Sequence, residues 1–148
     1  MKPKAKVIGC LSVFGGWFVV AAPAIASALL CDQAARQAAA DYGVPLVQML
    51  AIGRVETGRL HEGRLQPWPW TIHQAGQGHW FASGQQALDF AQAGLELGDD
   101  WQDLGCFQIN LHWHGGSFDS LADMIDPQRN ADYAARLLAE LHARYGSW

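Results

Sequence analysis

The segment Val44-Pro-Leu-Val-Gln-Met-Leu-Ala-Ile-Gly-Arg-Val-Glu-Thr-Gly58 decides the organisation that we predict for the chain. Pro45 favours a first helical position and Gly43 suits the end of a preceding helix, so a helix is expected to begin here. A buried stripe with three-and-four spacing is formed by Leu46, Met49, Leu50 and Gly53. Glu56 continues that stripe, which places an acid where the pattern calls for an apolar residue.

This position gives Glu56 a predicted chemical role. Burial disfavours the charged form of a carboxylate, and the negative end of the helix dipole acts in the same direction. A carboxyl group held in its protonated form could serve as a general acid at neutral pH. The alternative is that Glu56 pairs with an arginine (Arg54, Arg59 or Arg64) or lies exposed at the helix end, as most helical glutamates do.

The first residues have the charge plan of a secretory signal. Lys2, Lys4 and Lys6 precede an uncharged run from Val7 to Leu30, and Ala26-Ser27-Ala28 offers a small-x-small cleavage pattern. We therefore predict a signal peptide at residues 1–28 and one domain at residues 29–148. An uncleaved membrane anchor is the alternative, because the run is long enough to cross a bilayer.

Composition narrows the function classes for residues 29–148. This part is long enough for one hydrophobic core. It holds seven arginines against fourteen acids, so its net charge is near −7 and there is no clustered basic face for nucleic acid. Cys31 and Cys106 form an even pair in an exported chain, which predicts a disulfide, with two free buried thiols as the alternative.

The expected elements give an α+β fold, mainly α, with a small β element between helices. The first helix spans 30–42 with Asp32 as its N-cap, and the second spans 45–58. Residues 67–83 predict an irregular hairpin, and Ser83 with Gln86 predicts a capped helix that ends near Gly98. Residues 98–105 are expected to form a polar loop, and Cys106–His114 an extended segment.

The C-terminal part is expected to be helical. Ser120 with Asp123 suggests a capped helical turn, and Asp126-Pro127 predicts the start of a long helix that Gly146 ends. Its expected core stripe consists of Ala131, Ala134, Leu137, Leu138 and Leu141.

Six tryptophans lie in residues 29–148, and five of them fall in loop and strand segments rather than on helices. Flat aromatic rings suit the apolar faces of sugars, so Trp70 and Trp113 are candidates for lining a glycan cleft. The alternative is that such residues pack the core.

Two motifs in order carry a family resemblance. Glu56-Thr-Gly-Arg59 precedes Gly105-Cys-Phe-Gln-Ile-Asn110, and Asp126-Pro127 with an Asn-Ala-x-x-Ala-Ala run follows. With these motifs the chain resembles the lytic transglycosylase family, whose catalytic domain has a lysozyme-like fold. The resemblance covers residues 31–148. Because it also contains Pro67-Trp-Pro-Trp70, the chain is similar to a subgroup of small proteins that are exported to the periplasm.

The resemblance implies that Glu56 is the single catalytic acid and then base. It would cleave the bond between N-acetylmuramic acid and N-acetylglucosamine in peptidoglycan and leave a 1,6-anhydromuramoyl product. This chemistry needs neither a cofactor nor the second carboxylate of standard glycosidases. The alternative is a hydrolytic lysozyme, whose second acid would come from Glu62, Asp99, Asp100 or Asp103, each of which reads more simply as a solvated loop charge.

The same resemblance assigns the glycan contacts. Gln108 and Asn110 match the segment that lines the cleft, and Thr57 lies beside the acid. Strand alternation would put Cys106, Gln108 and Asn110 on one face, where a bond to Cys31 would tie the first helix to the cleft wall. A metal site could be considered for four histidines, which are His73, His79, His112 and His114. They do not have the ligand spacing of a zinc site, so we expect no metal.

The family usually continues into a segment whose tyrosine contacts the catalytic acid, and neither Tyr133 nor Tyr145 matches that position. A catalytically inactive scaffold that binds peptidoglycan is therefore a second alternative. The expected partners are peptidoglycan strands and an envelope-spanning secretion or flagellar assembly.

Overall fold

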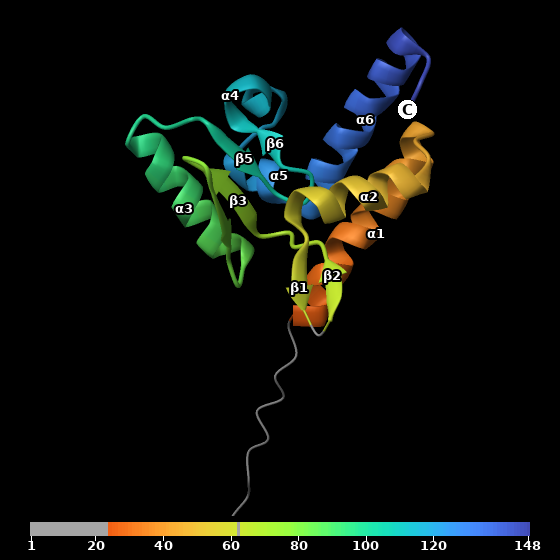
Figure 1. The fold of residues 1–148 in the computed structure, drawn as a ribbon. Helices are drawn as coiled ribbons and strands as arrows, with labels where there is room; N and C mark the ends of the chain where they lie inside the picture. Colours follow the sequence, from red (N-terminus) through yellow and green to blue (C-terminus); the bar gives the residue numbers. More distant parts are fainter. Residues whose placement is uncertain (1–23, 62) are drawn as a thin grey trace, which may run out of the picture.

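The computed structural model describes residues 24–61 and 63–148. Figure 1 shows a mixed α+β fold that is mainly helical, with a small sheet between helices, as predicted. The predicted signal peptide falls largely on residues 1–23, which lie outside the described residues, and none of the described helices is long and apolar enough to cross a membrane. The elements are α1 (Ala24–Tyr42), α2 (Leu46–Thr57), β1 (Arg59–His61), β2 (Arg64–Gln66), β3 (Thr71–Gln74), β4 (Gln77–Trp80), α3 (Gly84–Glu96), β5 (Gln102–Leu104), β6 (Ile109–Asn110), α4 (Leu111–His114), a 3-10 turn (Gly115–Ser117), α5 (Leu121–Ile125) and α6 (Pro127–Tyr145).

The helical side of the core is built on small residues. Helix α1 packs more extensively against α6 than against any other element, and α2 packs on α1. Alanine side chains let the two helix backbones approach closely, and burying them removes apolar surface from water. The buried alanines are Ala34, Ala35, Ala38 and Ala39 on α1 and Ala131, Ala134 and Ala135 on α6.

The β element has two parts. Strands β1 and β2 form a short hairpin that sequence patterns did not predict, and the larger sheet has the order β4-β3-β5-β6 with antiparallel neighbours. The β3–β4 hairpin turns at Ala75-Gly76, which confirms the predicted hairpin. Strand β5 lies in the stretch expected to be a polar loop, because Gln102–Leu104 pair with β3 at the centre of the sheet.

Helix ends follow the predicted capping chemistry. The hydroxyl of Ser83 accepts from the backbone N–H of Gln86, and Ser120 caps α5 in the same way. The carboxylate of Asp126 accepts from two backbone N–H groups at the start of α6, and Gly146 ends that helix with a φ of 77°. These caps confirm the predicted boundaries of α3, α5 and α6.

One prediction about α1 and one about α6 are wrong. Asp32 is not an N-cap, because α1 begins at Ala24; its carboxylate instead accepts from the Arg54 guanidinium at 2.8 Å. The predicted cleavage site after Ala28 thus falls within α1. Leu141 is 40% exposed rather than buried, because the buried residues of α6 lie in its N-terminal half.

The segment Cys106–His114 is not one extended strand. Residues Gly105–Gln108 form a turn in which Gly105 and Gln108 have φ values of 77° and 50°. Only Ile109 and Asn110 are in a strand, and α4 follows because the Asn110 side chain accepts from the Trp113 N–H and caps it. The expected alternation of faces along this segment therefore does not hold.

Candidate functional site

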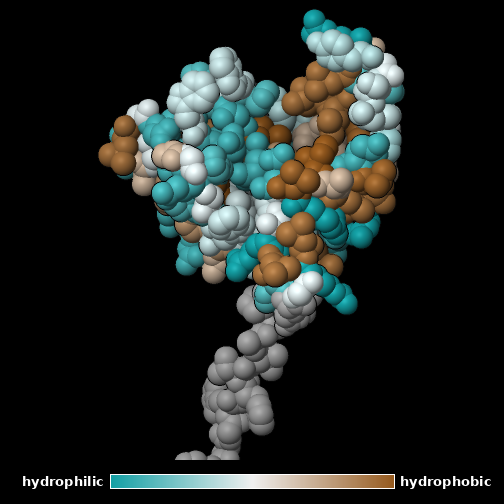
Figure 2. All heavy atoms as spheres, in the orientation of Figure 1, coloured by the Kyte–Doolittle hydropathy of each residue, from teal (hydrophilic) through white to brown (hydrophobic). Residues whose placement is uncertain are grey.

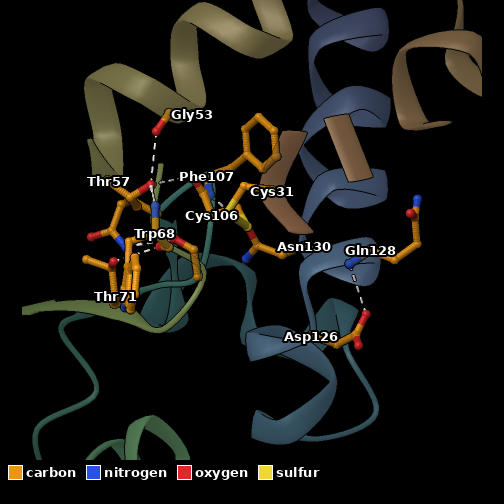
Figure 3. The surroundings of a disulfide bond; sticks show 12 residues. Cys31, Gly53, Thr57, Trp68, Thr71, Cys106, Phe107, Asp126, Gln128 and Asn130 are labelled. Atoms are coloured by element: carbon orange, nitrogen blue, oxygen red, sulfur yellow. Dashed lines mark hydrogen bonds between the residues drawn. A yellow bond between two sulfur atoms is a disulfide. The ribbon is translucent and has the colours of Figure 1, made fainter. Parts of the chain in front are cut away.

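The C-terminal end of α2 lies against the Gly105–Gln108 turn, and Thr57 connects them (Figure 3). Its hydroxyl donates to the Gly53 carbonyl at 2.9 Å, lies 3.4 Å from the Cys106 carbonyl and accepts from the Trp68 N–H at 3.1 Å. The side chain is fully buried. Thr57 therefore holds the two motifs together, and the prediction that it touches the glycan is corrected, since a ligand cannot reach it.

The neighbouring Glu56 is exposed, which corrects the prediction that it continues the core stripe. The buried stripe of α2 is Met49, Gly53 and Thr57 at spacings of four, and Glu56 lies one residue off it. The exposed alternative is the one observed.

The neighbouring arginines have other partners. Arg54 pairs with Asp32, and the Arg59 guanidinium lies 4.7 Å from the centre of the Trp68 ring. Among the described residues, no ion pair involves Glu56. The surface around it is partly apolar, because Val55 and Leu60 are 81% and 74% exposed; Figure 2 shows this brown surface over α2 and the β1–β2 hairpin, beside hydrophilic teal surface.

The disulfide confirms the predicted pairing of Cys31 with Cys106. The two Cα atoms are 5.6 Å apart and both cysteines are buried. The disulfide attaches the Gly105–Gln108 turn to α1, on the opposite side of the turn from the Thr57 hydroxyl (Figure 3).

Asn130 on α6 holds the same turn, and sequence reasoning missed this role. Its amide Nδ2 donates to the carbonyls of Leu104 and Met124, each at 2.9 Å, and its Oδ1 accepts from the Phe107 N–H at 2.8 Å. The residue is fully buried. A signal was present, because an asparagine directly before the alanine stripe of a long helix is a polar residue at a core position.

The side chains of Gln108 and Asn110 are half-buried and already hydrogen-bonded. The Gln108 amide donates to the Gly105 carbonyl at 2.9 Å and the Thr71 carbonyl at 3.2 Å. The Asn110 amide donates to Asp103 at 2.7 Å while its oxygen caps α4. Both residues therefore shape the loop beside the end of α2, and the predicted glycan contacts would fall to their remaining accessible atoms.

Two tryptophans are bonded to the end of α2, Trp68 through its backbone N–H and Trp80 through its indole. The Trp80 indole N–H donates to the Thr57 carbonyl at 3.3 Å, and the residue is 45% exposed. Sequence reasoning did not select it over the others. The predicted Trp70 instead packs against Gly84 of α3, where a Cβ would lie 3.1 Å from its ring, and Trp113 is exposed on α4.

The acids proposed for a lysozyme-type partner have local hydrogen bonds. Asp99 accepts from the Gln74 amide at 2.8 Å, Asp100 is bonded to His112 at 2.8 Å, and Asp103 accepts from Asn110. Glu62 lies outside the described residues. In the described part of the chain, no group of three or more His, Cys, Asp and Glu side chains is arranged to hold a metal ion.

Glu56 lies on open surface rather than in a closed pocket. Hollows of about 170–220 Å³ lie elsewhere on the described part of the chain, and Glu56 lines none of these. One of these hollows is lined in part by Arg129, whose pKa is raised by its side-chain hydrogen bond to Asp123. The Arg129 charge is already paired with Asp123, so this hollow is not the candidate site.

Comparison with known proteins found no match to this chain among protein-family models, curated proteins or solved structures. The family resemblance therefore rests on the motifs and their order.

Proposed function

We propose that the chain is a peptidoglycan lytic transglycosylase of lysozyme-like fold that acts in the periplasm. One observation carries the proposal: the two short motifs, 49 residues apart at Thr57 and Cys106, meet at the buried Thr57 hydroxyl. This contact joins the helix end that carries Glu56 to the turn of the second motif. The buried disulfide supports export to an oxidising compartment.

In this mechanism Glu56 acts twice. Its protonated carboxyl donates a proton to the glycosidic oxygen as the bond from that oxygen to C1 of the muramoyl residue breaks. The acetamido group of the same sugar stabilises the positive charge that develops at C1. The Glu56 carboxylate then removes the proton of the C6 hydroxyl, whose oxygen bonds to C1 and closes the 1,6-anhydro ring without water.

The exposed position of Glu56 suits a polymeric substrate. A long strand needs an open surface, and a sugar laid over Glu56 would remove its carboxyl group from water. Desolvation by the substrate would then favour the protonated form that starts the reaction. The exposed apolar side chains of Val55 and Trp80 nearby offer contact surface for sugar rings.

The test is digestion of isolated peptidoglycan by the purified protein, with the soluble fragments weighed by mass spectrometry. We expect muropeptides lighter than hydrolysis products by one water molecule, and none from Glu56→Gln. The matched control is Glu96→Gln, which changes another exposed helical glutamate and should cleave like the unchanged protein.

Other outcomes would overturn the proposal. Fragments of full hydrolytic mass would identify a lysozyme and direct attention to Glu62, Asp99, Asp100 and Asp103. Binding of peptidoglycan without any fragments would identify an inactive scaffold.

A further inference from the structure

An exposed aromatic cluster lies on α4 and the loop before β5. Trp101 and Trp113 are 56% and 69% exposed, and His112 lies between them. The His112 ring stacks on Trp101 at 4.3 Å between centroids with an angle of 14°. Trp113 stands nearly perpendicular to both rings, at 5.8 Å from Trp101 and 4.7 Å from His112. We call these three residues the aromatic corner.

The aromatic corner is held in place by hydrogen bonds. The Asp100 carboxylate is bonded to the His112 ring at Nδ1, at 2.8 Å, and the Asp99 carboxylate accepts from the backbone N–H of Trp101 at 3.0 Å. The Asn110 side chain accepts from the backbone N–H of Trp113. These bonds fix the backbone that carries the two tryptophans, and the rings pack against each other and against His112. A surface ordered in this way loses little conformational freedom when a ligand binds, which favours binding over a structural role for such exposed rings.

The aromatic corner is connected to the candidate site by a short stretch of chain. Gln108 is the last residue of the turn that contacts Thr57, and β6 leads from it directly to the helix that carries His112. Asn110 also bonds to Asp103 of β5, so the stretch is fixed to the sheet. A ligand that extends from the end of α2 along this stretch would reach the aromatic corner.

Charge and shape indicate the ligand. Perpendicular indole rings suit the apolar face of a pyranose, and carboxylates and ring nitrogens at the edge suit its hydroxyl and amide groups. The Asp100 carboxylate lies beside the His112 ring and would repel an anion. A neutral N-acetylglucosamine unit therefore fits better than a muramoyl unit with its acidic substituent.

We propose that the aromatic corner of Trp101, His112 and Trp113 is a distal subsite that holds an N-acetylglucosamine residue of the glycan strand away from the bond that is cleaved. The inference rests on the proposed function for the identity of the strand. Because the subsite contacts no reacting atom, it raises affinity for long strands and leaves the chemical step unchanged.

The test uses the full chain with Glu56→Gln as background and chitopentaose, an oligomer of N-acetylglucosamine, as probe. Isothermal titration calorimetry should show affinity about ten-fold lower with Trp113→Ala and nearly unchanged with Trp113→Phe. Trp148→Ala removes another exposed tryptophan, stacked on His142 at the end of the chain, and is the matched control with unchanged affinity.

A second measurement separates this inference from the proposed function. In chains that keep Glu56, Trp113→Ala should raise KM for long strands and leave kcat unchanged. If the unchanged protein cleaves nothing but Trp113→Ala still weakens chitopentaose binding, the subsite stands and the transglycosylase proposal fails. Equal chitopentaose binding by Trp113→Ala and the background, or no binding by either, overturns the subsite even if cleavage is intact.

Discussion

The side chain of Asn130 on α6 occupies the space that a Cβ on Gly105 would need. A Cβ built on Gly105 would lie 2.7 Å from Asn130 Nδ2 and 2.8 Å from its Cγ, closer than such atoms approach in proteins. The backbone of Gly105 has a φ of 77°, which also favours glycine. The glycine of the turn and the asparagine of the helix therefore depend on each other, although they are far apart in sequence.

The first prediction compares two glycines with the same backbone conformation. Gly98 has a φ of 82° and nothing within 4 Å of a built Cβ, so Gly98→Ala meets only the backbone strain, about 1 kcal/mol. Gly105→Ala meets that strain and the Asn130 side chain, so we expect it to lower the free energy of unfolding by about 3 kcal/mol. Urea denaturation measures both. Equal losses would show that Asn130 moves aside freely.

The second prediction removes the asparagine. Asn130→Ala leaves the Leu104 and Met124 carbonyls and the Phe107 N–H without their partner, and buried polar groups without partners are costly. We expect a loss of about 3 kcal/mol in urea denaturation, against almost none for Glu140→Ala on the exposed side of the same helix. Gly105→Ala combined with Asn130→Ala should cost less than the sum of the two, because the clash is gone.

The parts of the fold that could be predicted are those set by neighbouring residues. Ser83 and Asp126 cap helices through backbone groups two or three residues away, so the starts of these helices could be predicted from the sequence. Gly146 ends α6 for an equally local reason. The disulfide was predictable because residues 29–148 contain two cysteines, and one pairing was possible.

The parts that could not be predicted depend on distant contacts. Gln108 adopts a φ of 50°, which no local pattern indicates, within a turn that Asn130 and the disulfide hold. The stripe of α2 includes Thr57 rather than Glu56 because the Trp68 N–H and the Cys106 carbonyl satisfy a buried hydroxyl there. The burial of a threonine could therefore be predicted only if its hydrogen-bond partners were known.

The third prediction concerns the disulfide. It joins residues 75 apart, and in the chain-entropy model a loop of that length contributes about 4 kcal/mol to stability. Cys31→Ala with Cys106→Ala should lower the free energy of unfolding by about that amount and make stability insensitive to dithiothreitol. A double variant as stable as the oxidised protein would contradict the predicted contribution.

The fourth prediction separates position from chemistry at the end of α2. Thr57→Val keeps the shape of the side chain and leaves the Trp68 N–H without an acceptor, so it should cost about 1–3 kcal/mol in urea denaturation. Thr57→Ser keeps the hydroxyl and is the matched control, with a loss of about 1 kcal/mol for the missing methyl group.

Because Thr57 does not touch the ligand, chitopentaose affinity should be nearly equal for both variants. If Glu56 is the catalytic acid, however, kcat on peptidoglycan should fall more with Thr57→Val than with Thr57→Ser. The valine variant no longer fixes the end of α2 to the Cys106 turn. Equal kcat values for the two variants would show that the hydroxyl contributes to stability alone.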